Sequence, residues 1–110
     1  MTKLLRLADY RHPADRVSFD RRELKKLLAI YAERVAGGEW RDYAIDMRGH
    51  MAAFAVFRSS YDWPLYLIAK FAPGSRKQGN YVVWSGPRRL IQGRSLDEVL
   101  CIFERAPRGA

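Results

Sequence analysis

Basic and aromatic side chains are interleaved in one segment of this 110-residue chain, and their chemistry suits a polyanion. The segment contains Arg76, Lys77, Tyr81, Trp84, Arg88, Arg89 and Arg94. Guanidinium and ammonium groups neutralise phosphates, and aromatic rings stack on nucleic-acid bases. We therefore take five cations and one ring as the candidate polyanion-binding residues: Arg76, Lys77, Arg88, Arg89, Arg94 and Trp84.

The positive charge of the chain is segregated. Between Asp62 and Asp97 there is no carboxylate, yet this stretch holds six lysines and arginines of the 20 in a chain with a net charge of +8 at pH 7. A one-sided positive field attracts nucleic acid or an acidic protein without selecting between them. The alternative is that these cations form a solvated face that keeps a small domain soluble.

Metal and nucleophile chemistry has little support in the sequence. His12 and His50 have no cysteine or carboxylate near them at metal-ligand spacing. Cys101 lies between Leu100 and Ile102, where a buried structural thiol is expected. We predict no metal, no cofactor and no catalytic residue.

A phosphate-binding loop is also disfavoured. Gly74 and Gly79 have the spacing of a P-loop, but Asn80-Tyr81 follow where lysine and serine or threonine are required. A strand is expected next, whereas a P-loop precedes a helix. The segment is therefore predicted to be an exposed hairpin connection.

An enzyme remains an alternative only if distant residues converge in the fold. The candidates are Glu39, Arg41, Asp42 and Asp46. Asp42 and Asp46 would be about 13 Å apart along a strand, which is too far for the paired carboxylates of a glycosidase. We therefore expect a non-enzymatic protein.

Two helices are expected to position these groups. Asp20 and Glu23 form a capping-box pattern that starts a helix, and Gly37-Gly38 ends it. Its predicted apolar stripe consists of Leu24, Leu27, Leu28, Tyr31 and Val35. A second capping box, Ser95 to Glu98, opens a carboxy-terminal helix that buries Val99, Leu100, Ile102 and Phe103.

Between the helices the apolar pattern has a period of two, which predicts strands at residues 40–47, 52–58, 65–71 and 81–85, with a shorter one near 89–92. Gly49-His50 is predicted to form a type II′ turn that pairs Ile45 with Phe54 and Tyr43 with Val56. The short connections require antiparallel neighbours. The fold class is therefore α+β, with an N-terminal helix, an antiparallel meander sheet of four to five strands and a C-terminal helix.

Apolar residues are expected on both faces of the sheet. Phe57, Tyr66 and Ile68 are assigned to the second face, away from Phe54 and Val56. This face is covered either by one of the helices, with the two helices on opposite faces, or by a partner such as a second copy. We favour cover within the chain.

Length and composition favour one domain at residues 16–105, preceded by a flexible segment at 1–15 and followed by a flexible tail at 106–110. The first residues lack the apolar run and cleavage site of a signal peptide, so we expect none, and we expect no apolar run to cross a membrane. A single cysteine fits a reducing compartment. We expect a cytoplasmic protein that does not contact the membrane.

Four stretches resemble one family. They are Val17 to Leu24, Gly38 to Asp46, Pro64 to Tyr66 and Arg76 to Gly79, and the Gly-Glu-Trp-Arg-Asp-Tyr run is the most specific part. The chain is similar over about Arg16 to Glu104 to the alphaproteobacterial family called domain of unknown function 2794. The resemblance implies a bacterial cytoplasmic protein and supplies no activity, cofactor or site residue.

The sequence therefore predicts a binding or adaptor module with a basic surface, whose partner is nucleic acid or an acidic protein. The alternative is a protein-interaction or homodimerisation domain that uses the apolar sheet face around Phe57, Tyr66 and Ile68.

Overall fold

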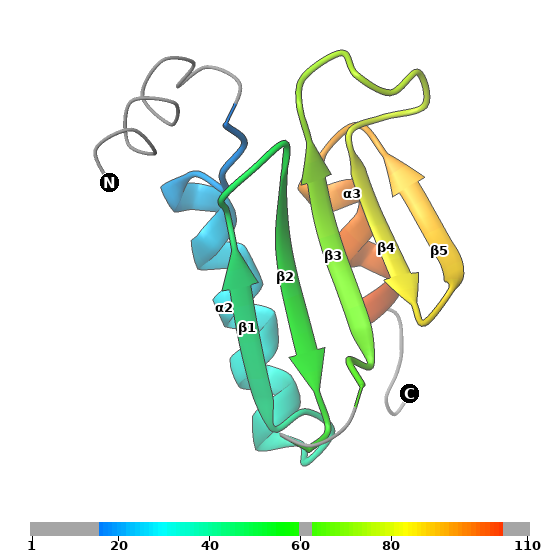
Figure 1. Cartoon of the computed structure of the whole chain (residues 1–110). Coiled ribbons are helices and arrows are strands. Elements are labelled where there is room, and N and C mark those ends of the chain that lie inside the picture. The colour runs from blue at the N-terminus through cyan, green and yellow to red at the C-terminus, as the bar shows by residue number, and fades with distance from the viewer. Residues whose placement is uncertain (1–15, 60–62, 105–110) are drawn as a thin grey trace.

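A computed structural model describes residues 16–59 and 63–104 (Figure 1). Its elements in chain order are α2 (Arg21–Ala36), β1 (Asp42–Asp46), β2 (Met51–Phe57), β3 (Tyr66–Phe71), β4 (Tyr81–Ser85), β5 (Arg88–Gly93), α3 (Leu96–Leu100) and the 3-10 turn η2 (Cys101–Phe103). The α+β class is confirmed. The predicted flexible ends, and His12 with them, lie outside the described residues, and one domain over 16–105 stays a prediction.

The five strands form one antiparallel sheet in the order β1-β2-β3-β4-β5. Each connection is short, so each strand pairs with the strand before it (Figure 1). Ile45 lies opposite Phe54 and Tyr43 opposite Val56, as the sequence predicts. The register follows because a slip of one residue would turn every apolar side chain to the other face.

The type II′ turn at Gly49-His50 is wrong. Gly49 does not have the positive φ that this turn requires at its first central residue, and residues 48–50 form a bend. The Gly49 carbonyl accepts a hydrogen bond from the Val17 amide at 3.0 Å. The predicted register therefore comes from the apolar pattern and not from the turn type.

Helix α2 starts with the predicted capping box. The Asp20 carboxylate accepts from the Glu23 amide at 2.8 Å, and Glu23 Oε1 accepts from the Asp20 amide at 2.9 Å. The buried stripe is shifted from the prediction, because Ile30 is buried beside Leu27 whereas Leu28 and Val35 are exposed. The apolar residues of this helix allow more than one choice of buried stripe, and packing against the sheet decides which residues are buried.

The second helix is short. Ser95 Oγ accepts from the Glu98 amide at 3.1 Å, but Glu98 Oε1 accepts from the Arg94 amide at 2.9 Å, so the return bond of the box lies one residue early. The buried residues of α3 and η2 are Leu96, Val99, Leu100 and Phe103, while the predicted Ile102 is only partly buried.

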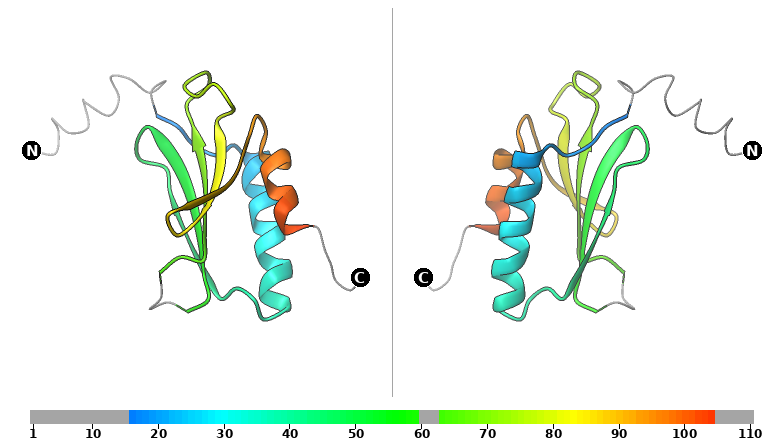
Figure 2. Two further views of the ribbon diagram at one scale, coloured as in Figure 1. Left: turned by 90° about the vertical axis from the view of Figure 1, so that its right-hand side faces the viewer. Right: turned by 90° about the vertical axis from the view of Figure 1, so that its left-hand side faces the viewer.

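Both helices cover the same face of the sheet (Figure 2). That face carries Phe54, Val56, Ile68 and Val83, which form one buried cluster with Leu27 and Ile30 of α2 and with the residues of α3. The expectation that the helices lie on opposite faces is therefore wrong. So is the assignment of Tyr66 and Ile68 to the second face, because the register places them opposite Val56 and Phe54.

Aromatic rings pack against one another in the part of the core that contains Trp40 and η2. Trp40 packs edge-on against Phe103 with ring centroids 5.4 Å apart, and Phe103 meets Tyr66 at 5.0 Å. Tyr43 stacks on Phe54 at 5.2 Å. These rings bridge β1, β2, β3 and η2, so the carboxy-terminal turn is held by aromatic contacts despite its short length.

Glu23 links α2 to the middle of the sheet. Its carboxylate pairs with Lys70 Nζ of β3 at 2.7 Å and accepts a hydrogen bond from the Tyr81 hydroxyl of β4, in addition to the capping bond. Lys70 also donates to the Ser18 carbonyl at 2.8 Å. Only 13% of the Glu23 side chain and 17% of the Lys70 side chain are exposed, so this ion pair is largely shielded from water.

We predict that Glu23→Gln lowers the free energy of unfolding by roughly 2 kcal/mol, because it leaves a shielded ammonium without its counter-ion. Urea unfolding followed by circular dichroism measures this loss. Glu33→Gln, an exposed site on the same helix, is the matched control and should change stability by less than about 0.5 kcal/mol. Equal losses in the two variants would contradict a special role for Glu23.

We also predict that the protein loses stability as the pH rises above about 10. Burial raises the pKa of the Tyr81 phenol, and the hydrogen bond to Glu23 and the charges of Glu23 and Asp20 raise it further. A raised pKa in the folded state means that the unfolded chain gives up this proton first, so the contribution is complete below pH 10 and is lost at higher pH. Unfolding midpoints between pH 8 and 11 should fall less steeply in Tyr81→Phe than in the wild type.

Candidate polyanion interface

No helix among the described residues covers the second face of the sheet, which we call the helix-free face (Figure 2). The register places these side chains on it: Asp42, Ala44, Asp46, Ala53, Ala55, Phe57, Leu67, Ala69, Phe71, Val82, Trp84, Arg89 and Gln92. Four are alanines, so the floor over β1, β2 and β3 is shallow. The aromatic side chains on this face, Phe57, Phe71 and Trp84, lie at or near the ends of their strands.

Two aromatic rings lie between two arginines across the β3 to β5 half of this face. The Arg76 guanidinium lies 3.9 Å from the centroid of the Phe71 ring. Phe71 meets Trp84 at 6.3 Å with an angle of 78° between the ring planes. Trp84 in turn pairs across the strands with Arg89, which donates to Gln92 Oε1 at 2.9 Å. The candidate residues Arg76, Trp84 and Arg89 are thus neighbours in one row.

Three of the candidate cations belong to segments at one end of the sheet, which we call the basic end: Arg76, Lys77 and Arg94. Arg94 also lines a pocket on the helix side, beside Glu23 and Asp97. Arg76 and Lys77 belong to the loop between β3 and β4, and Arg94 follows β5. Arg94 Nη2 donates to the Lys77 carbonyl at 3.4 Å. Within the described residues, none of the three forms an ion pair with a carboxylate.

The other two candidates lie away from the basic end. Arg88 starts β5 beside the Gly86-Pro87 turn and pairs with Ser85, so it is about 20 Å from Arg94 along the strand. The five cations therefore do not form one compact patch. Arg89 stays connected to the basic end through Trp84 and Phe71, whereas no contact of the described residues connects Arg88 to it.

Glycines bring the loop against β5. Gly79 has a φ of +124°, and a Cβ there would lie 2.0 Å from the Gly93 carbonyl oxygen. Gln92 Nε2 also donates to the Gly79 carbonyl at 2.9 Å. This close approach of two backbones places Lys77 beside Arg94. Of the two glycines with P-loop spacing, Gly79 therefore has a structural role, which is to let the two backbones approach closely.

The opposite margin of the helix-free face is acidic. Asp42 and Asp46 are exposed on β1, at the far edge from β5. Arg48 pairs with Asp46 at 3.0 Å and lowers the pKa of that carboxyl. Asp42 accepts a hydrogen bond from the Tyr43 amide at 2.8 Å. A polyanion on this face is therefore attracted most to the β3 to β5 half, whose segment has no carboxylate between Asp62 and Asp97.

A groove of about 710 Å³ adjoins Arg76 at the same end of the face. It runs between the β1–β2 bend and the β3–β4 loop and is lined by Asp46, Arg48, Gly49, His50, Met51, Ala53, Phe71, Ala72, Ser75 and Arg76. Sequence reasoning missed Phe71 and the bend as parts of the site. The signal that could have found Phe71 is strand alternation, which places it on the same face as Trp84 of the neighbouring strand β4.

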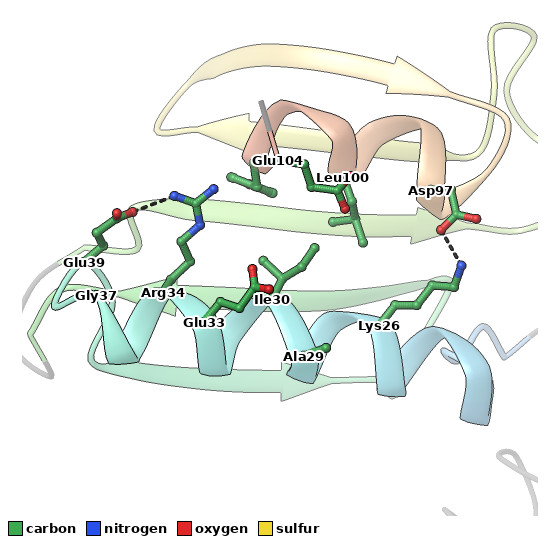
Figure 3. A pocket seen from close by; sticks show the side chains of 11 residues that line it. Lys26, Ala29, Ile30, Glu33, Arg34, Gly37, Glu39, Asp97, Leu100 and Glu104 are labelled. Atoms are coloured by element: carbon green, nitrogen blue, oxygen red, sulfur yellow. Dashed lines mark hydrogen bonds and ion pairs between the residues drawn. The ribbon is translucent and has the colours of Figure 1, made fainter. Parts of the chain in front are cut away.

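A second cleft, of about 750 Å³, lies between α2 and the α3–η2 segment (Figure 3). Lys26 pairs with Asp97 at one end and Arg34 with Glu39 at 2.8 Å at the other. Glu39 therefore points into this cleft, while Asp42 and Asp46 lie on the helix-free face. The residues of the enzyme alternative do not converge.

Cys101 is exposed, so its predicted burial is wrong. Its Sγ donates to the Glu98 carbonyl at 2.9 Å, because the 3-10 turn directs Phe103 and not Cys101 into the core. His50 is exposed in the β1–β2 bend. In residues 16–59 and 63–104 no three histidine, cysteine or acidic side chains lie close enough to hold a metal ion.

Comparison with known families assigns the chain. Residues 17–100 match the family described as protein of unknown function (DUF2794). The chain belongs to this family. The resemblance carried by the Gly-Glu-Trp-Arg-Asp-Tyr run is confirmed, and the family description supplies no activity for the basic end or the helix-free face.

No curated protein and no solved structure matches the chain. Within the part of the chain that the structure describes, none of the helices has the length and apolar content needed to cross a bilayer.

We predict that Gly79→Ala lowers the free energy of unfolding by about 2–3 kcal/mol and separates the loop from β5, since both φ and the Gly93 carbonyl exclude a Cβ. Gly74→Ala is the matched control: its φ is also positive, at +78°, but nothing lies within 4 Å of the added carbon. Chemical denaturation should show about 1 kcal/mol for the control. Equal losses of stability in the two variants would mean that the strained φ accounts for the whole effect and that the contact with the Gly93 carbonyl contributes nothing.

Proposed function

We propose that this protein binds polyanions, through the basic end and the adjoining β3 to β5 half of the helix-free face. The observation that supports the proposal is that Arg76, Lys77 and Arg94, from two segments at one end of the sheet, form no ion pair among the described residues. The Glu98 carboxylate binds Arg94 only at its backbone amide. Like charges that gather repel one another, and a bound anion relieves that repulsion. Elsewhere on the molecule, Lys26, Arg34, Arg48 and Lys70 each have an acidic partner.

The proposal describes a binding module and not an enzyme. Its support is the exposure of the cations on a loop and a strand end, where a long ligand can reach them without entering a cavity. The segment from Asp62 to Asp97, which supplies the β3 to β5 half of the face, contains six lysines and arginines and no carboxylate between those two aspartates. Nucleic acids and acidic proteins both satisfy these requirements.

We predict that the triple variant Arg76→Gln, Lys77→Gln, Arg94→Gln loses most of its affinity for a fluorescein-labelled abasic oligodeoxynucleotide of twelve phosphates. Three phosphate contacts on a single strand give a salt slope near −2, so wild-type affinity should fall about 20-fold between 50 and 200 mM salt. Fluorescence anisotropy at both salt concentrations measures the affinity and the slope. In the variant the slope should be smaller by about 2.

The matched control is Arg21→Gln, Lys25→Gln, Arg41→Gln, which removes three charges from exposed positions outside the proposed site. It should retain most of the wild-type affinity and slope. Equal losses in the two triple variants would indicate a response to net charge alone. Absence of wild-type binding at 50 mM salt would refute the proposed function.

A second candidate function is association through the helix-free face, favoured by Phe57, Leu67 and Phe71, which no described helix covers. Five strands at about 4.8 Å and five to seven residues long give a face of roughly 400 Å². Stable interfaces bury about 800 Å² on each partner, so this face alone is small for a dimer. Sedimentation of the free chain separates the two functions, since a dimer at micromolar concentration would favour the second.

A further inference from the structure

Trp84 lies on the helix-free face between two arginines, Arg89 and Arg76. Arg89 is its cross-strand partner on β5. On the β3 side, the Trp84 ring contacts the Phe71 ring, and the Arg76 guanidinium lies over Phe71. An aromatic ring adds nothing to the binding of a bare chain of phosphates. It adds affinity only when the ligand has flat rings of its own.

Both rings are partly exposed. Arg76 lies over the Phe71 ring at 3.9 Å, so one face of that ring is already occupied. Phe71 and Trp84 are 78° apart, so they cannot form one continuous platform. From these contacts we infer that the polyanion is a single-stranded nucleic acid, with a base stacked on Trp84 and its neighbouring phosphates held by Arg76 and Arg89. This inference rests on the proposed function, because it names the class of polyanion.

A single strand fits this site better than a duplex. In a duplex the bases are stacked on one another and present only their edges in the grooves, so the indole has no base face to contact. The strip from β3 to β5 is about 10 Å wide, and the acidic margin of β1 lies about 19 Å from β5. A narrow strand can stay on the strip, where Arg76 and Arg89 attract it. Asp46 lines the groove beside Arg76, but Arg48 pairs with its carboxylate.

The experiment compares two labelled dodecamers with the same number of phosphates, oligothymidylate and the abasic strand. Because stacking on one ring strengthens binding severalfold or more, wild-type protein should bind oligothymidylate about tenfold more tightly than the abasic strand. Trp84→Leu should remove this preference while its affinity for the abasic strand stays within about twofold. Trp84→Phe, which keeps a ring, should restore part of the preference.

Trp63→Leu is the matched control, because Trp63 is 88% exposed. It should leave the tenfold preference intact. If Trp84→Leu does not fold, fluorescence supplies the readout in the Trp63→Phe protein, where only Trp84 and the buried Trp40 emit. Oligothymidylate should quench that emission, and the abasic strand should not.

Equal affinities for the two dodecamers, with salt-dependent binding of both, would overturn the stacking inference and leave the proposed function intact. A preference that disappears in Trp63→Leu and persists in Trp84→Leu would also overturn it. Tighter binding of a duplex with the same sequence than of the single strand would do the same. No binding of either dodecamer would refute the inference and the proposed function together.

Discussion

The Glu23 carboxylate is the interaction on which the arrangement of this protein depends. It caps its own helix, pairs with Lys70 on β3 and accepts the hydroxyl of Tyr81 on β4. A single shielded anion therefore fixes the start of α2 over the centre of the sheet. Its partners must come from the same sheet face, so this network also determines which face the helix covers.

Covering one face leaves the other without a helix. Because α3 follows β5 and packs its Val99 and Leu100 into the same cluster as Leu27, both helices share one core. The remaining face has small residues at its centre, aromatic rings and cations towards β5, and carboxylates on β1. That distribution is a consequence of the fold, and it locates the proposed ligand on the β3 to β5 half of the face.

The basic end depends on a backbone contact and not on charge. Gly79 and Gly93 approach so closely that no Cβ fits at Gly79, and the hydrogen bond from Gln92 holds the loop there. Lys77 and Arg94 become neighbours as a result, although 16 residues separate them in the sequence. Arg88 begins β5 whereas Arg94 follows the end of that strand, so the extended strand separates the two.

The sequence alone determined what local rules decide: the Asp20–Glu23 capping box, the strand pattern, the antiparallel order and the Ile45–Phe54 register, since each follows from neighbouring residues or from alternation. It also identified Arg76, Lys77, Arg94 and Trp84 as candidates. Only the tertiary structure decided that both helices lie on one face, that Tyr66 and Ile68 belong to the core, that Cys101 is exposed and that Arg88 stands apart. These outcomes depend on contacts between residues distant in the chain, and a pattern of period two cannot tell which of its two faces a helix will cover.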